Sequence, residues 1–80
     1  MRLTDHQTKT LHALKRLNGY DGWCPTAPEV SRDLGYAKYW AAPKLNALAK
    51  RGLAERVCDD PSFVTWRITN AGIALIDPRP

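Results

Sequence analysis

Basic side chains gather in one part of this sequence. Between residues 32 and 56 there are six bases against two acids, while the rest of the chain has six of each, so this segment carries the whole net charge of +4. The six are Arg32, Lys38, Lys44, Lys50, Arg51 and Arg56. Such a cluster suits phosphate groups, because neutralising them releases the counterions condensed around a nucleic acid. The pattern favours a phosphate-binding surface, and the alternative is an ordinary solvated face.

Other chemistry has little support in the residue pattern. The carboxylates are spread along the chain, and no Ser, Cys or Lys has a recognisable base beside it. His6 and His12 are six residues apart on one predicted helix and so lie on different faces, which does not suit a metal. Cys24 and Cys58 are expected to stay reduced. We therefore predict no enzyme, no cofactor and no metal site.

Length and hydropathy predict one small domain over residues 1–80. No stretch approaches the roughly 20 apolar residues that span a bilayer. The start of the chain lacks the apolar core of a signal peptide. These features predict a soluble protein of the cytoplasm.

Two capping boxes predict the first two helices. In each, a threonine accepts from a backbone N–H three residues on, and a Glu or Gln side chain reaches back. The pairs are Thr4 with Gln7 and Thr26 with Glu29. The first helix should end at Asn18-Gly19 and the second at Gly35, where glycine provides a stop. A short extended piece at Trp23-Cys24 should separate them, because the residue before a proline avoids helical angles.

A third helix is predicted between residues 38 and 51. Ala41, Leu45 and Leu48 have helical spacing, and the glycine at position 52 closes the pattern. Pro43 removes one backbone hydrogen bond and crowds the preceding turn. The first turn is therefore expected to be irregular, or the regular helix to begin near Ala41.

The last third of the chain reads as a hairpin followed by a short helix. Residues 53–57 and 63–68 are predicted strands, joined by a turn-rich tip over 58–62. Alternation places Val64, Trp66 and Ile68 on the face that covers the helices. Thr69 then begins a short last helix. The element order predicts an α+β winged helix-turn-helix, with a three-helix core, a two- or three-stranded wing and a short C-terminal helix.

This pattern resembles two families of regulators. Over about residues 3 to 56 the chain resembles the N-terminal DNA-binding domain of LexA-type repressors, and beyond it the step from strand to helix looks like that of MarR-type regulators. The first resemblance rests on Leu3-Thr4, Gln7, Gly22, Pro25-Thr26, Glu29-Val30, Leu34-Gly35 and Leu45-x-x-Leu48-Ala49-Lys50-Arg51-Gly52, and the second on Trp66-Arg67-Ile68-Thr69-Asn70-Ala71-Gly72. The segment between Gly35 and Leu45 is one residue shorter than in LexA. The base contacts of LexA are therefore not carried over to this chain, and candidate contacts are derived from the geometry of the third helix.

At 100° per residue, the outward face of the third helix holds Tyr39, Trp40, Pro43 and Asn46, flanked by Lys38 and Lys44. Asn46 can pair with an adenine edge, the lysines can hold phosphate or guanine, and the apolar groups can pack on thymine methyls. Two alternatives stay open. Trp40 can fold back into the core, or Tyr39, Trp40 and Pro43 can dock on a protein partner.

Further phosphate contacts are predicted on either side of the third helix. Thr26 and Arg32 belong to the second helix, whose N-terminus can donate to a phosphate. Arg56 and Arg67 lie on the wing and can straddle a minor groove or the backbone. Acidic residues at positions 59 and 60 would repel phosphates, which argues against deep insertion of the wing.

The combined expectation is a sequence-specific regulator of transcription that binds double-stranded DNA and resembles a repressor. Such domains commonly act as dimers on two half-sites, so a homodimer is a possible partner arrangement. Two other functions compete with it. One is a winged-helix module for protein–protein interaction, and the other is an architectural DNA-binding accessory factor, which bending of bound DNA would identify.

Overall fold

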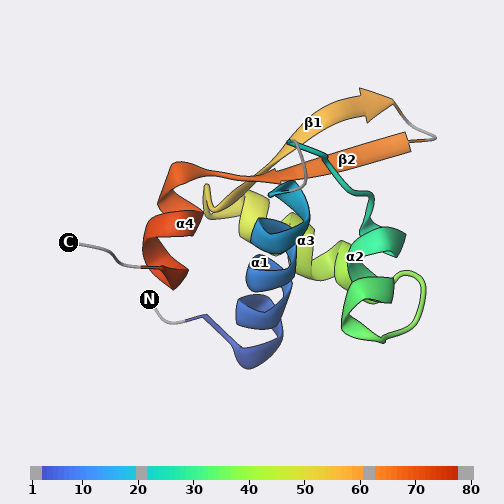
Figure 1. The fold of residues 1–80 in the computed structure, drawn as a ribbon, viewed down its shortest axis with the longest axis horizontal. Helices are drawn as coiled ribbons and strands as arrows, with labels where there is room; N and C mark the ends of the chain where they lie inside the picture. Colours follow the sequence, from blue (N-terminus) through green and yellow to red (C-terminus); the bar gives the residue numbers. More distant parts are fainter. Residues whose placement is uncertain (1–2, 20–21, 61–62, 78–80) are drawn as a thin grey trace.

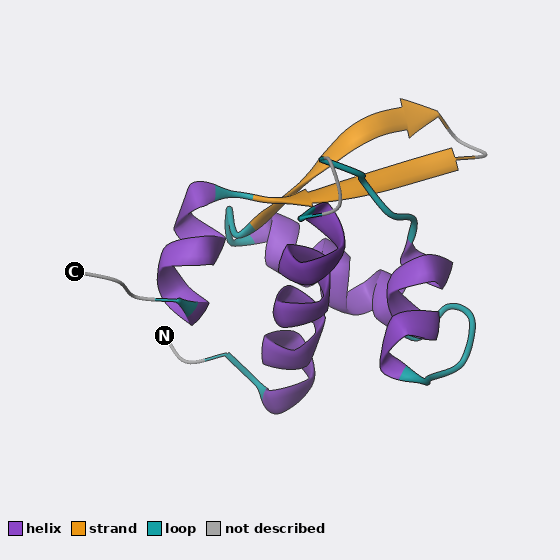
Figure 2. Cartoon of the chain, in the orientation of Figure 1, coloured by secondary structure: helices purple, strands orange, loops and turns teal. Residues whose placement is uncertain are grey.

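The computed structural model describes residues 3–19, 22–60 and 63–77. Within them the chain forms helices and one two-stranded antiparallel sheet (Figure 1). The elements are α1 (Asp5–Asn18), α2 (Ala27–Leu34), α3 (Ala41–Lys50), β1 (Ala54–Asp60), β2 (Phe63–Ile68) and α4 (Asn70–Ile76). The hairpin extends along one side of the helices, and the loop before α2 runs beside β2 (Figure 2). This arrangement confirms the predicted α+β winged helix-turn-helix.

The helix bounds follow from the local signals in the sequence. The predicted capping box opens α1, with the Gln7 N–H donating to Thr4 Oγ1 and the Thr4 N–H donating to Gln7 Oε1, each at 3.1 Å. Gly35 ends α2 with a φ of 79°, a left-handed conformation that glycine adopts without steric cost. The regular part of α3 begins at Ala41, as the position of Pro43 predicted.

The wing differs from the prediction in its length. β1 continues to Asp60, so three residues assigned to the turn-rich tip, Cys58, Asp59 and Asp60, are paired in the ladder. Between Arg56 and Cys58 the register shifts, which leaves Val57 as the extra residue of a β-bulge. The side chains of Asp59 and Asp60, and the whole of residues 61–62, lie outside the described part of the structure. The predicted repulsion at the tip therefore stays a prediction.

The base of the wing is joined to the segment before α2. Thr26 forms an isolated antiparallel bridge with Thr65, and the Trp66 N–H donates to the Pro25 carbonyl at 2.9 Å. The predicted extended stub is thus present as a single bridge at Thr26, two residues beyond Cys24. Thr65 is buried because this segment covers it, although it alternates with core residues along β2. Both cysteines are free thiols.

The core surrounds α1. Leu11 and Leu14 of α1, Val30 of α2, and Leu45 and Leu48 of α3 are completely buried. Trp66 and Ile68 close the core from β2, and their burial confirms the predicted inward face of that strand. The fold therefore holds α2 and α3 against α1, and the hairpin packs along one side of the three helices. Among the described residues no helix has the length and apolar character needed to cross a membrane.

Asn18, the last residue of α1, joins three segments. Its Oδ1 accepts from the Ile68 N–H at 2.8 Å, and its Nδ2 donates to the Trp23 carbonyl at 2.8 Å and the Trp66 carbonyl at 3.4 Å. A side-chain amide suits this position because it offers an acceptor and two donors together. Asn18 therefore fixes the wing to the end of α1.

Replacing Asn18 with alanine is expected to lower the free energy of unfolding by about 2 kcal/mol, because partly buried backbone groups lose their partners. Denaturant unfolding monitored by tryptophan fluorescence measures this. The control is Asn70→Ala in α4, where the side chain is exposed, and its effect should stay within about 0.5 kcal/mol. Equal effects for the two variants would contradict the joining role of Asn18.

Candidate nucleic-acid interface

A serine in α2 holds the start of α3. Ser31 is completely buried, its hydroxyl donates to the Ala27 carbonyl at 2.9 Å, and its Oγ accepts from the Ala41 N–H at 2.9 Å. Ala41 is the first residue of α3, and its amide would otherwise have no partner within the helix. Trp40 precedes it and makes no side-chain cap. Ser31 therefore sets where α3 begins relative to α2.

The exposed face of α3 is the surface that this arrangement presents. Ala41, Leu45 and Leu48 face the core, which leaves Pro43 and Lys50 exposed on the opposite side. Tyr39, just before the helix, is 65% exposed, and Lys38 Nζ lies 5.3 Å from the centre of its ring. We call Tyr39, Pro43, Asn46 and Lys50 the α3 face. Lys50 was counted in the basic segment but was not assigned to the outward face of the third helix, although the 100° rotation per residue places it beside Pro43.

Trp40 does not belong to this face. It is half-buried and packs against the core, with its ring stacked on Tyr36 at a centroid distance of 4.2 Å. His6 meets the same ring edge-on at 5.4 Å, and Lys44 Nζ lies 4.4 Å from its centre. The structure thus places Trp40 against His6 of α1, with Lys44 over the Trp40 ring, rather than on the predicted outward face. A protein-docking surface of Tyr39, Trp40 and Pro43 loses its largest ring by this placement.

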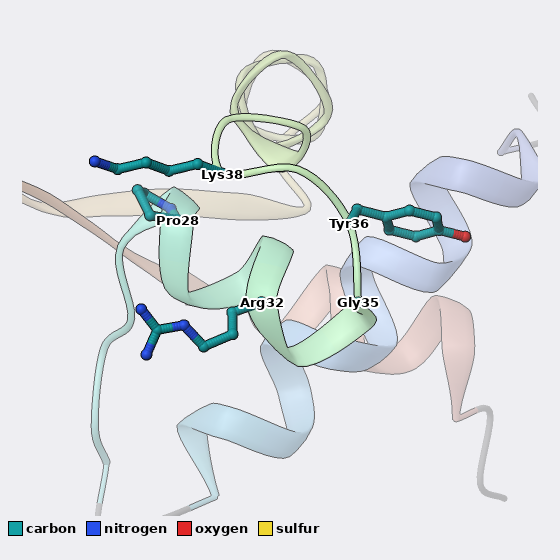
Figure 3. Close-up of a pocket in the computed structure, with 5 residues that line it drawn as sticks. All are labelled: Pro28, Arg32, Gly35, Tyr36 and Lys38. Carbon is teal, nitrogen blue, oxygen red and sulfur yellow. The ribbon is translucent and has the colours of Figure 1, made fainter.

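The outer side of α2 carries cations next to the α3 face. Arg32 and Lys38 line an open pocket with Pro28, Gly35 and Tyr36. Figure 3 shows Lys38 and Pro28 close together on one side of the pocket, with Arg32 on the outer surface of α2, whereas Tyr36 points the opposite way toward α1. Thr26 lies at the start of α2, where its N–H and O–H both donate to Glu29 Oε1, at 2.9 and 3.0 Å. Its hydroxyl is thus engaged in the helix cap.

The acids of the basic segment are paired with arginines from outside it. Asp33 bonds to Arg16 of α1, and Glu55 bonds to Arg67 of β2. Hydrogen bonding to the Glu55 carboxylate, together with its negative charge, raises the pKa of Arg67 above its ordinary value. These pairs leave the positive charge of residues 32–56 without compensation from the two acids of the same segment.

The two wing arginines lie on different faces of the hairpin. Glu55 pairs in register with Arg67, and Arg56 pairs with Trp66. Trp66 faces the helices, so Arg56 lies on the side of α3, while Arg67 and Glu55 lie on the outer side. Arg56 donates to Asn46 Oδ1 at 2.9 Å, and its guanidinium carbon is 5.6 Å from the centre of the Trp66 ring. The hairpin therefore brings Arg56 to the α3 face and keeps Arg67 away from it.

These features define a winged helix-turn-helix, in which α2 and α3 form the helix pair and the hairpin forms the wing. Solved structures show the same fold. MepR of Staphylococcus aureus, a winged-helix regulator of the MarR type, was solved bound to ethidium bromide, and it superposes with a TM-score of 0.76 at 23% sequence identity over 96% of this chain. Its A103V mutant, from a multidrug-resistant clinical isolate, gives a TM-score of 0.74 at 22% identity over 95% of this chain.

A candidate DNA-binding protein from Ralstonia eutropha JMP134 also matches, with a TM-score of 0.76 at 18% identity over 96% of both chains. The present chain spans about half of MepR, 54% of its length. No protein-family model and no curated protein sequence matches this chain. The likeness confirms the predicted resemblance to MarR-type regulators in fold.

Proposed function

We propose that this protein binds double-stranded DNA through the α3 face and regulates transcription as a repressor in the cytoplasm. The observation that carries the proposal is the exposed positive charge of Lys38 and Lys50 beside the α3 face. Lys38 and Lys50 are exposed beside Tyr39 and Pro43, and the acids at positions 33 and 55 are paired elsewhere. An exposed helix of this kind fits the major groove, with flanking cations on phosphates.

In this proposal the named residues have distinct tasks. Lys38, Arg32 and the start of α2 at Thr26 contact the phosphates on one side of the groove. Arg56 reaches the groove beside Asn46, and Tyr39 and Pro43 meet the base edges through apolar contacts. Lys44 and Trp40 support the α2–α3 turn from the side of α1, and Arg67 remains outside the interface. Two copies bound to half-sites about 10 base pairs apart would give a symmetric operator.

A salt series with operator-length duplexes tests the proposal directly. Binding should weaken steeply as salt rises, because each phosphate contact releases counterions. Absence of binding at low salt, or a flat dependence, would contradict DNA binding. A protein-docking role for Tyr39 and Pro43 predicts that flat result. Analytical ultracentrifugation of the complex gives the number of copies per duplex.

Replacing Lys50 with alanine should weaken binding to all duplexes alike and reduce the slope of log affinity against log salt by about 1. The reason is that an exposed lysine of the α3 face holds phosphate without reading sequence. Fluorescence anisotropy at several salt concentrations measures the slope. The matched control is Lys15→Ala, since Lys15 lies on α1 and pairs with Asp77 at 2.8 Å. An equal change of slope in the control would argue against a specific role for the α3 face.

A further inference from the structure

The side chain of Asn46 is held in one orientation by the wing. Its Oδ1 accepts a hydrogen bond from an Arg56 Nη at 2.9 Å. A guanidinium can only donate, so the amide oxygen must be the atom that faces it, and this settles which end of the amide is which. Arg56 is itself placed over the ring of Trp66, whose side chain is buried. Asn46 therefore presents its amide from a fixed position on the α3 face.

This contact changes what Asn46 can recognise. To pair with adenine through two hydrogen bonds, an asparagine accepts from the N6 amino group and donates to N7. The guanidinium of Arg56 lies next to the accepting oxygen, so an adenine amino group would approach a positive charge that is also a donor. The guanidinium and the adenine amino group repel each other, so the pairing of Asn46 with adenine is weakened.

Guanine offers the opposite pattern. Its major-groove edge presents two acceptors, N7 and O6, whereas adenine presents one acceptor and one donor. The Nδ2 group of Asn46 can donate to one acceptor, and the positive guanidinium beside it favours a second acceptor over an amino group. Cytosine presents an amino donor in the groove and is disfavoured for the same reason as adenine.

We propose that Asn46 and Arg56 act as one composite reading element that selects guanine over adenine at one position of the DNA site. The inference rests on the proposed function and adds the base preference of the same surface. It also revises the expectation that Asn46 reads adenine. Arg56 acts here as a specificity-determining residue contributed by the wing rather than by α3.

Selection of bound duplexes from a random pool tests this with the full chain. The wild type should enrich guanine at one position that Asn46→Ala makes indifferent. Arg56→Met, which retains an apolar stem over Trp66, should shift that position toward adenine, because the positive charge beside Oδ1 is then removed. The matched control is Arg67→Met, which removes an arginine from the outer face of the same hairpin and should leave the motif unchanged.

Base analogues in the selected site supply a second measurement that does not depend on the folding of variants. Exchanging the guanine for adenine or for 7-deazaguanine should weaken wild-type binding roughly tenfold, because one acceptor is lost. Inosine keeps N7 and O6 and should bind as guanine does. Adenine enriched by the wild type, or an Arg56→Met motif identical to the wild-type one, would overturn this inference and leave DNA binding intact. Failure of the wild type to bind any duplex would overturn the proposed function and the inference with it.

Discussion

Replacing Gly72 with alanine should lower the free energy of unfolding by about 3 kcal/mol, the upper part of the range for overpacking a tight contact. Gly72 lies in the first turn of α4, and a Cβ added there would be 2.3 Å from the Leu53 carbonyl oxygen and 2.9 Å from Ile68 Cγ1. The same carbonyl accepts from the Thr69 N–H at 3.1 Å, so it cannot move away without breaking that bond. Urea unfolding monitored by circular dichroism measures the loss.

Gly35→Ala is the informative control for this prediction. At Gly35 a Cβ would meet no atom within 4 Å, and the cost comes only from the positive φ of 79°. We expect about 1 kcal/mol for that backbone strain. If Gly72→Ala cost no more than Gly35→Ala, the close approach of α4 to Leu53 would not be what requires glycine at position 72.

The second large effect is expected at Ser31. Replacing it with alanine removes the acceptor for the buried Ala41 N–H, and an unsatisfied buried donor costs about 2 kcal/mol. The damage should be local to the start of α3, because that amide belongs to the first turn of the helix. Native-state hydrogen exchange should show faster exchange of the Ala41 amide, and the affinity for DNA should fall together with stability.

Thr10→Val provides the comparison for Ser31. Thr10 is also completely buried, and its hydroxyl donates to the His6 carbonyl at 2.8 Å within α1. That carbonyl keeps its ordinary helical partner when the hydroxyl is lost, and valine preserves the shape of the side chain. A loss below about 1 kcal/mol is expected. If both variants cost the same, removal of any buried hydroxyl would explain the Ser31 result, and its link to α3 would not be needed.

Much of the fold could be predicted because residues close together in the sequence determine where its helices begin and end. A threonine followed three residues later by Gln or Glu marks the start of α1 and of α2, and Gly35 marks a stop that needs positive φ. The effect of Pro43 on its own helix is equally local, and it placed the start of α3 correctly. Each of these signals acts within one turn of helix, so no knowledge of distant contacts was required.

The candidate site was less predictable because tertiary contacts decide it. Trp40 turns toward α1 since Tyr36 and His6 offer it a packed position, and neither is near it on a helical wheel. The burial of Ser31 was not predicted, because a serine followed by two charged residues gives no indication that it lies in the core. β1 is longer than predicted because pairing with β2 compensates for the low strand preference of aspartate at positions 59 and 60. The hydrogen bond between Arg56 and Asn46 could not be predicted, because it forms only when the hairpin folds back over α3.

The bonds at the base of the wing also limit how the protein moves. Near Thr65 and Trp66, β2 is bonded on both sides, to β1 and to the segment that leads into α2. Bending of the hairpin must therefore occur farther out, beyond the bulge at Val57. The base of the wing and the start of α2 then move as one rigid body, and bending is confined to the outer part of the hairpin. Amide exchange should be slow at Trp66 and faster in the described residues of β1 beyond the bulge.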